Sequence, residues 1–224
     1  MEGASEPGAP APTSRVGEGV YRARPWRVHA LAADFRLLDV WRLPLDADPD
    51  PTRGQTFDRF LRLFLANGVQ ADSALANALF RLRLVAGRVL GLDRPGRPPG
   101  IPGTDEPSIA VRLGPADRAR DRTAALVLDV PALAAPVYVF EEEALFEIAN
   151  RTVSALLHLG WVDAAARAGT TARKTAELAV YVKPRGRLGA VYMALIGPFR
   201  HTFVYPPWLG RIGRLWREET SRAA

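Results

Sequence analysis

Residues 146–162 read FEIANRTVSALLHLGWV, and this stretch decides the expected fold. Apolar and polar residues alternate on both sides of an Asn-Arg pair, and such a period of two is typical of half-buried strands. Because Asn tolerates the left-handed backbone of a tight turn, the pair predicts a β-hairpin. The second strand carries Thr152, Ser154 and His158 at alternate positions, so one of its faces presents three polar groups.

Other segments on both sides of this hairpin also have the character of strands. Each is a short run rich in Val, Leu, Ile or aromatic residues, and most are bounded by turn-forming residues. The expected strands are residues 35–44, 108–113, 124–130, 136–142, 144–149, 152–162 and 175–184.

Apolar residues at helical spacing predict two helices after the first strand, over residues 56–68 and 72–93. Thr56 is placed to cap the first of them. A third apolar face runs from 188 to 199, where Pro198 is expected to bend the helix. Pro206 and Pro207 are expected to end that segment before a last short helix. The apolar run at 188–199 is shorter than the roughly 20 residues that a bilayer requires.

The remaining segments predict the limits of one domain. Residues 1–20 are rich in Gly, Pro, Ala and Ser without an apolar period, so a disordered tail is expected there. A Pro- and Gly-rich run at 94–107 predicts a mobile loop. Residues 21–224 are expected to form a single domain.

A strand, two helices, a run of antiparallel strands and a long closing helix follow one another along the chain. This is the order of the α+β helix-grip fold, in which a curved antiparallel sheet wraps around a long C-terminal helix. The sheet and the helix leave a volume between them that neither fills, and ligand pockets form in such places.

Four motifs in order along the chain carry a family resemblance. NRTV begins at Asn150, HLGW at His158, VKPRG at Val182, and YMALIGPFR at Tyr192, ahead of VYP at 204–206. With these motifs the chain resembles an uncharacterised bacterial family of the START-like, polyketide cyclase (SRPBCC) superfamily, which implies the helix-grip fold. Relatives often carry His where this chain has Ser154, so no role of that His carries over.

The composition narrows the classes of function. The chain has 224 residues and no cysteine, which excludes disulfides and thiolate sites and favours a cytoplasmic location. All but two of its thirty basic residues are Arg, and no dense basic helix accompanies the net charge of +6, so no nucleic-acid partner is expected. No phosphate-binding glycine motif is present, and no nucleotide cofactor is expected. The three histidines are scattered and Glu141–Glu143 has the character of a solvated strand end, so no metal site is expected.

The polar strand face, with residues near it in the expected fold, forms the candidate site. Ser154 and His158 lie too far apart on one strand, about 13 Å, to act as nucleophile and base. Arg200 is expected either to bind an acidic ligand group or to pair with a carboxylate such as Glu147. The alternative for each of these side chains is that it is buried in the core and contacts no ligand. The candidate ligand-binding residues are Asn150, Thr152, Ser154, His158, Trp161, Tyr181, Tyr192, Arg200 and Tyr205.

Three hypotheses for the function follow. The first is binding of a small, largely apolar molecule between the sheet and the C-terminal helix. The second is a cofactor-independent enzyme of the cyclase or aromatase type, in which His158 is the catalytic acid or base and Arg200 or a tyrosine holds an enolate. The third is a partner-binding module that uses the loop at 94–107.

Overall fold

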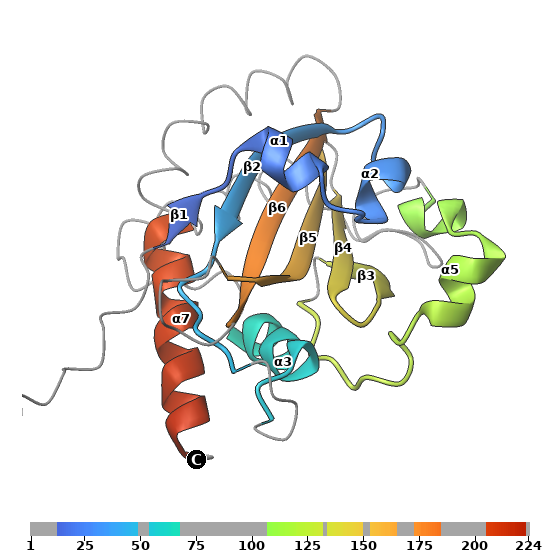
Figure 1. The fold of residues 1–224 in the computed structure, drawn as a ribbon. Coiled ribbons are helices and arrows are strands. Elements are labelled where there is room, and N and C mark those ends of the chain that lie inside the picture. The colour runs from blue at the N-terminus through green and yellow to red at the C-terminus, as the bar shows by residue number, and fades with distance from the viewer. Residues whose placement is uncertain are drawn as a thin grey trace, which may run out of the picture.

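The computed structural model describes residues 13–48, 54–67, 107–131, 134–149, 153–164, 173–184 and 205–222. These residues form an α+β structure around one curved antiparallel sheet, whose six strands lie in the order β1-β2-β6-β5-β4-β3 (Figure 1). The strands are β1 (Ser14–Arg15), β2 (Arg36–Arg42), β3 (Ala135–Val139), β4 (Glu143–Ala149), β5 (Val153–Asp163) and β6 (Lys174–Pro184). The helices are α1 (Glu18–Arg22), α2 (Val28–Leu31), α3 (Phe57–Asn67), the 3-10 turn η2 (Ile109–Arg112), α5 (Pro115–Arg120) and α7 (Tyr205–Arg222).

The predicted pair of strands around the Asn-Arg turn is confirmed. β4 and β5 pair antiparallel from Glu143 with Gly160 to Ala149 with Ser154, while the turn itself lies outside the described residues. β5 also pairs with β6 along its whole length, without a break in register. Because side chains alternate across an unbroken strand, even-numbered residues of β5 lie on one face of the sheet and odd-numbered residues on the other.

The odd-numbered face is covered by α3 and α7, which pack against each other (Figure 1). Trp161 of β5 lies among aromatic rings from both helices, with ring centroids 5.6 Å from Phe60 and 6.0 Å from Trp216. The expected helix after the first strand is confirmed as α3, and the hydroxyl of Thr56 accepts a hydrogen bond from the backbone N–H of Arg59 at 3.4 Å. An aromatic core therefore fills this face.

The last helix differs from the short one predicted after the two prolines. α7 has 18 residues, begins at Tyr205 and contains Pro206 and Pro207 in its first turn. Proline is tolerated there because the first N–H groups of a helix have no partner within the helix. The prolines therefore lie in the first turn of this helix, while the segment that they were expected to end lies outside the described residues.

The even-numbered face is covered by the N-terminal segment and by η2. Tyr21, Val28 and Leu31 are buried against Leu156 of β5, in one apolar cluster with Ile109. The guanidinium of Arg112 at the end of η2 donates to the backbone carbonyl of Leu31 at 2.7 Å. Contacts remote in sequence thus hold the N-terminal segment on the sheet.

The boundary of the disordered tail at residue 20 is wrong for residues 13–20. Ser14 and Arg15 pair with β2, and the backbone N–H of Val16 donates to the carbonyl of Val40 at 2.9 Å. α1 then begins at Glu18. Backbone hydrogen bonds hold this stretch on the edge of the sheet, and such pairing does not require an apolar period in the sequence. A prediction based on the apolar period therefore assigned the stretch to the disordered tail.

Two predicted strands are also wrong. Residues 109–112 form η2, because Glu147 accepts hydrogen bonds from the hydroxyl of Ser108 and the N–H of Ile109, both at 2.9 Å. Residues 124–130 form turns and irregular structure, in which Val127 is 92% exposed. Apolar residues in these short runs therefore do not mark a sheet face.

Three further predictions concern residues outside the described ranges. They are the helix at 72–93, the loop at 94–107 except its last residue, and the helix at 188–199. Within the described residues, no helix combines the length and the apolar character that spanning a bilayer requires.

Candidate functional site

A row of polar positions crosses the even-numbered face of the sheet. Neighbouring strands place Arg42 of β2 beside Glu177 of β6, Glu177 beside Gly160 of β5, and Gly160 beside Glu143 of β4. Glu177 is 0% exposed and Glu143 is 5% exposed. Gly160 has no side chain, so the row has a gap between two buried carboxylates on strands that each lie about 4.8 Å from β5.

His158 lies beside this row, and both of its ring nitrogens have protein partners. Its Nε2 is 3.0 Å from Oε2 of Glu143, and its Nδ1 is 2.9 Å from the hydroxyl of Tyr21. The same carboxylate accepts hydrogen bonds from the hydroxyl of Tyr138 and from the backbone N–H of Arg27. The result is a connected hydrogen-bond network around an imidazole that is 0% exposed.

The environment fixes the ionisation of the groups around His158. Burial alone raises the pKa of Glu143, but the hydrogen bond and charge of His158, with the hydrogen bonds from Tyr138 and Arg27, outweigh burial and lower it. Burial raises the pKa of both Tyr21 and Tyr138, and nearby negative charge raises both further. The network therefore places an ionised carboxylate at one ring nitrogen of His158 and a neutral phenol at the other, and the two together orient the imidazole.

A second histidine lies against the other side of Tyr21. The ring of His29 makes an edge contact with the Tyr21 ring at 5.1 Å, and its Nδ1 is 3.1 Å from the hydroxyl of Tyr181. Burial and the charge of His158 lower the pKa of His29. Its other nitrogen, Nε2, is buried and has no hydrogen-bond partner in the structure as described.

Glu177 is held at one oxygen only. Arg24 and Arg42 each donate from a terminal nitrogen to Oε1, at 3.0 and 2.8 Å. The second oxygen, Oε2, is buried without a hydrogen-bond partner among the described residues, as are the Nε atoms of both arginines. A buried carboxylate normally receives hydrogen bonds at both oxygens, so this one is incompletely satisfied.

Trp26 covers the gap at Gly160. A Cβ on Gly160 would lie 2.9 Å from Cζ2 and 3.2 Å from Cε2 of the indole, and 3.3 Å from Cε1 of His158. The indole nitrogen of Trp26 is buried and lacks a hydrogen-bond partner in the described ranges. The ring therefore rests directly on the strand between the two carboxylates.

Comparison with known proteins places the chain in a family. Residues 31–207 match the model of a family described as a protein of unknown function, DUF2867. The chain belongs to this family. Glu143, His158 and Glu177 lie inside the matched range, whereas Tyr21, Trp26 and His29 precede it. No curated protein and no solved structure matches the chain.

The structure divides the predicted site residues of this DUF2867 protein between the two faces of the sheet. Ser154, His158 and Tyr181 are buried on the even-numbered face, where the regular strand keeps Ser154 about 13 Å from His158. Trp161 and Tyr205 are buried on the opposite face, where the Tyr205 ring lies 5.4 Å from that of Trp41. The other four, Asn150, Thr152, Tyr192 and Arg200, lie outside the described residues.

Sequence reasoning missed, among others, five residues of this site. Glu143 was assigned to a solvated strand end, but only Glu141 and Glu142 are exposed, because β4 begins at Glu143 and turns its side chain toward His158. Glu177 was identifiable as a charged residue inside the otherwise apolar run AELAVYV. No local pattern singles out the other three, Tyr21, Trp26 and His29.

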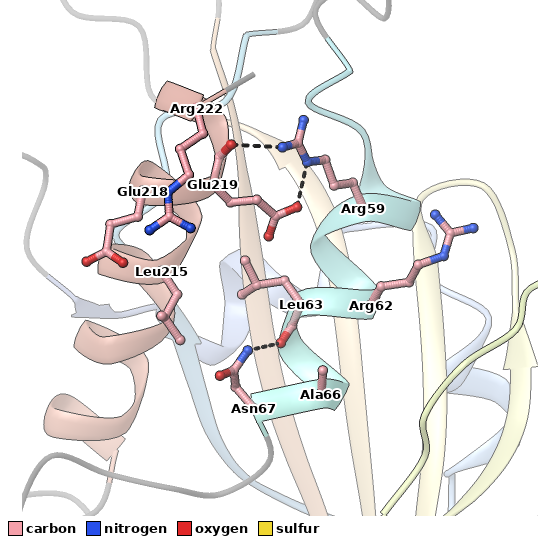
Figure 2. Close-up of a pocket in the computed structure, with 9 residues that line it drawn as sticks. All are labelled: Arg59, Arg62, Leu63, Ala66, Asn67, Leu215, Glu218, Glu219 and Arg222. Atoms are coloured by element: carbon pink, nitrogen blue, oxygen red, sulfur yellow. Dashed lines mark hydrogen bonds and ion pairs between the residues drawn. The ribbon is translucent and has the colours of Figure 1, made fainter. Parts of the chain in front are cut away.

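A groove of about 440 Å³ lies on the surface between α3 and α7 (Figure 2). Arg59 spans it, donating to the side chain of Glu219 at 2.8 Å and to its backbone carbonyl at 2.9 Å. Arg62 and Arg222 add further charge to its walls. The groove is therefore a charged surface feature and differs from the apolar volume between sheet and helix that the sequence predicted.

The described residues offer no preformed metal centre. No group of three or more His, Cys, Asp or Glu side chains among them could hold a metal ion.

Proposed function

We propose that this DUF2867 protein binds a small amphipathic molecule on the His158 face of the sheet, beside the segment that contains α1 and α2. One observation carries the proposal: six buried polar atoms on that face have no hydrogen-bond partner in the described part of the chain. They are Arg24 Nε, Trp26 Nε1, Arg27 Nε, His29 Nε2, Arg42 Nε and Glu177 Oε2.

Such atoms are rare in folded proteins because each costs about 1–3 kcal/mol when it is buried without a partner. Their concentration on one face supports a bound molecule that supplies the missing donors and acceptors. The rings of Tyr21, Trp26 and Tyr181 provide apolar surface for the rest of that molecule. This site differs from the sequence hypothesis in lying on the face opposite α3 and α7.

Two of the residues with these unpartnered atoms are partly exposed. The side chains of Arg24 and Arg42 remain 25% and 29% exposed, although the Nε atom of each is buried. Because Glu177 itself is 0% exposed, a ligand that reaches it would enter where these two arginines meet solvent.

A second candidate function is acid–base catalysis of the cyclase type, and the Glu143–His158–Tyr21 network supports it. An imidazole held by a carboxylate is a common proton acceptor, and a phenol on the other side of the ring can donate a hydrogen bond to an enolate. Catalysis would require Tyr21 and Trp26 to move, since His158 is fully buried beneath them. Binding at Glu177 also requires the side chains around it to move, because its free oxygen is buried, but it does not require access to His158.

Native mass spectrometry of the full chain, purified without organic additives, tests the binding function. We expect an adduct with the mass of a small molecule, and we expect Glu177→Gln to reduce its occupancy. Arg62→Gln, which changes the groove between α3 and α7, is the matched control and should leave the occupancy unchanged. Absence of any adduct, together with ordered water alone at the six atoms in a crystal structure, would contradict the proposal.

A further inference from the structure

The two side chains next to Gly160 define which chemical group the site accepts. We infer that Glu177 and Trp26, framed by Arg24 and Arg42, bind a neutral hydroxyl group. This inference rests on the binding function proposed above and specifies the ligand class of the same site: alcohols or phenols, with the hydroxyl on an apolar body.

The unpartnered atoms of these four residues include both an acceptor and donors. The free oxygen of Glu177 is an acceptor, whereas the indole nitrogen of Trp26 and the Nε atoms of Arg24 and Arg42 are donors. A single ligand group that satisfies both kinds of partner must donate once and accept at least once. A hydroxyl has one O–H and two lone pairs, so it meets this requirement.

Trp26 and Glu177 lie beside the same residue of β5, Gly160. Cε2 of Trp26, the ring carbon bonded to the indole nitrogen, is 3.2 Å from the point that a Cβ on Gly160 would occupy. Glu177 is the cross-strand partner of Gly160, and both residues lie on the same face. The backbone N–H of Trp26 also donates to the carbonyl of Arg24 at 2.8 Å, which keeps Arg24 near the indole.

The charged groups around the site disfavour a ligand group that is itself an ion. An anionic group at this position would lie against the free oxygen of a buried carboxylate, and a cationic group would lie against two guanidinium groups. Either arrangement places like charges together in a poorly solvated site. A neutral donor–acceptor group avoids both.

Three naphthalene derivatives test the inference because they share one apolar body. We propose titrations of the full chain at neutral pH with 1-naphthol, 1-naphthoate and 1-naphthylmethylammonium, followed by isothermal calorimetry and ligand-observed NMR. The expected result is that 1-naphthol binds at least about tenfold more tightly than either ion. Tighter binding of either ion would overturn the inference.

Glu177→Gln should reverse this preference between 1-naphthol and 1-naphthoate. The amide nitrogen then replaces the free oxygen, so the site loses its acceptor and its negative charge while both arginines remain. We expect 1-naphthol to bind about tenfold more weakly and 1-naphthoate about tenfold more tightly. Glu147→Gln is the control: it changes a buried carboxylate on the same face that binds Ser108 and Ile109, and it should leave the preference unchanged.

Trp26→Phe provides a second variant if Glu177→Gln does not fold. It keeps a ring over Gly160 and the charge of the site but removes the indole donor, so 1-naphthol affinity should fall and the ion affinities should not rise. If the variants that fold keep the same preference for 1-naphthol, the hydroxyl group does not bind at Glu177 and Trp26. An adduct in native mass spectra without a hydroxyl preference would refute this inference alone, whereas no adduct and no probe binding would refute the binding function as well.

Discussion

Oε2 of Glu143 lies 3.0 Å from Nε2 of His158, and the two residues belong to neighbouring strands of one hairpin. Tyr21, from the start of the chain, occupies the other ring nitrogen at 2.9 Å. His158 therefore connects the centre of the sheet to the N-terminal segment. The acid–base role that the sequence suggested for His158 needs a ring nitrogen that a substrate can reach, and both nitrogens have protein partners in the structure.

The first prediction concerns this pair. His158→Phe should lower the free energy of unfolding by about 3 kcal/mol, because it leaves the Glu143 carboxylate and the Tyr21 hydroxyl short of a partner in the core. Glu143→Gln should also destabilise, and the double variant should lose about 1.5–3 kcal/mol less than the sum. Urea denaturation at neutral pH measures all four proteins.

Glu147 provides the control for that cycle. It is a buried carboxylate of the same strand, but it binds Ser108 and Ile109. The effects of Glu147→Gln and His158→Phe should add to within about 0.5 kcal/mol. Equal coupling in both cycles would show that the apparent interaction comes from a general loosening of the sheet.

The sheet was more predictable from sequence than the site. The sequences of β4, β5 and β6 alternate with a period of two, which indicates the residues that lie on each face of the sheet. The same alternation on both sides of the Asn-Arg pair predicts the hairpin. The cover on the His158 face gives no such signal, since Tyr21 and His158 are 137 residues apart and Arg24 and Glu177 are 153 apart. Pairs this distant depend on the three-dimensional path of the chain, so no local pattern indicates them.

The second prediction tests whether Trp26 rests on Gly160. Gly160→Ala should destabilise the protein by about 1–3 kcal/mol, because the new methyl group would lie 2.9 Å from the indole ring. In a Trp26→Ala background the same change should be neutral or stabilising, since alanine restricts the unfolded chain more than glycine does. Thermal and urea unfolding of the four proteins checks this; a similar loss in both backgrounds would show that the indole is not the obstacle.

The third prediction compares two glycines of α7. A Cβ on Gly210 would meet only Arg214 at 3.9 Å, whereas one on Gly213 would lie 2.5 Å from the ring and 3.0 Å from the carbonyl oxygen of Pro44. Gly210→Ala should stabilise by about 0.5–1 kcal/mol through helix propensity. Gly213→Ala should destabilise the protein despite the same gain in helix propensity, because the new methyl group would clash with the ring and the backbone carbonyl of Pro44. Unfolding curves that show stabilisation in both variants would contradict the close packing of α7 on Pro44.

The last prediction concerns acid and His29. Burial, together with the charge of His158, lowers the pKa of His29 in the folded protein below its ordinary value of 6.5. The unfolded chain therefore takes up this proton first as the pH falls, and the contribution of neutral His29 to stability is complete above pH 6.5 and decreases below it. The structure explains the direction, since a proton on the buried Nε2 would meet no acceptor among the described residues.

His29→Gln should remove this part of the acid sensitivity. Between pH 7.5 and pH 5, the urea midpoint of unfolding should fall more for the wild type than for the variant. Tyr181→Phe is the matched control, because it removes the partner of Nδ1 but keeps the titrating ring, and it should retain the loss at low pH. Tyr21, Tyr181, His158, Arg22 and Glu143 surround the ring and are unchanged in His29→Gln, so their own titration is present in both proteins. If wild type and His29→Gln lose stability in parallel between these pH values, the acid response originates elsewhere on this face.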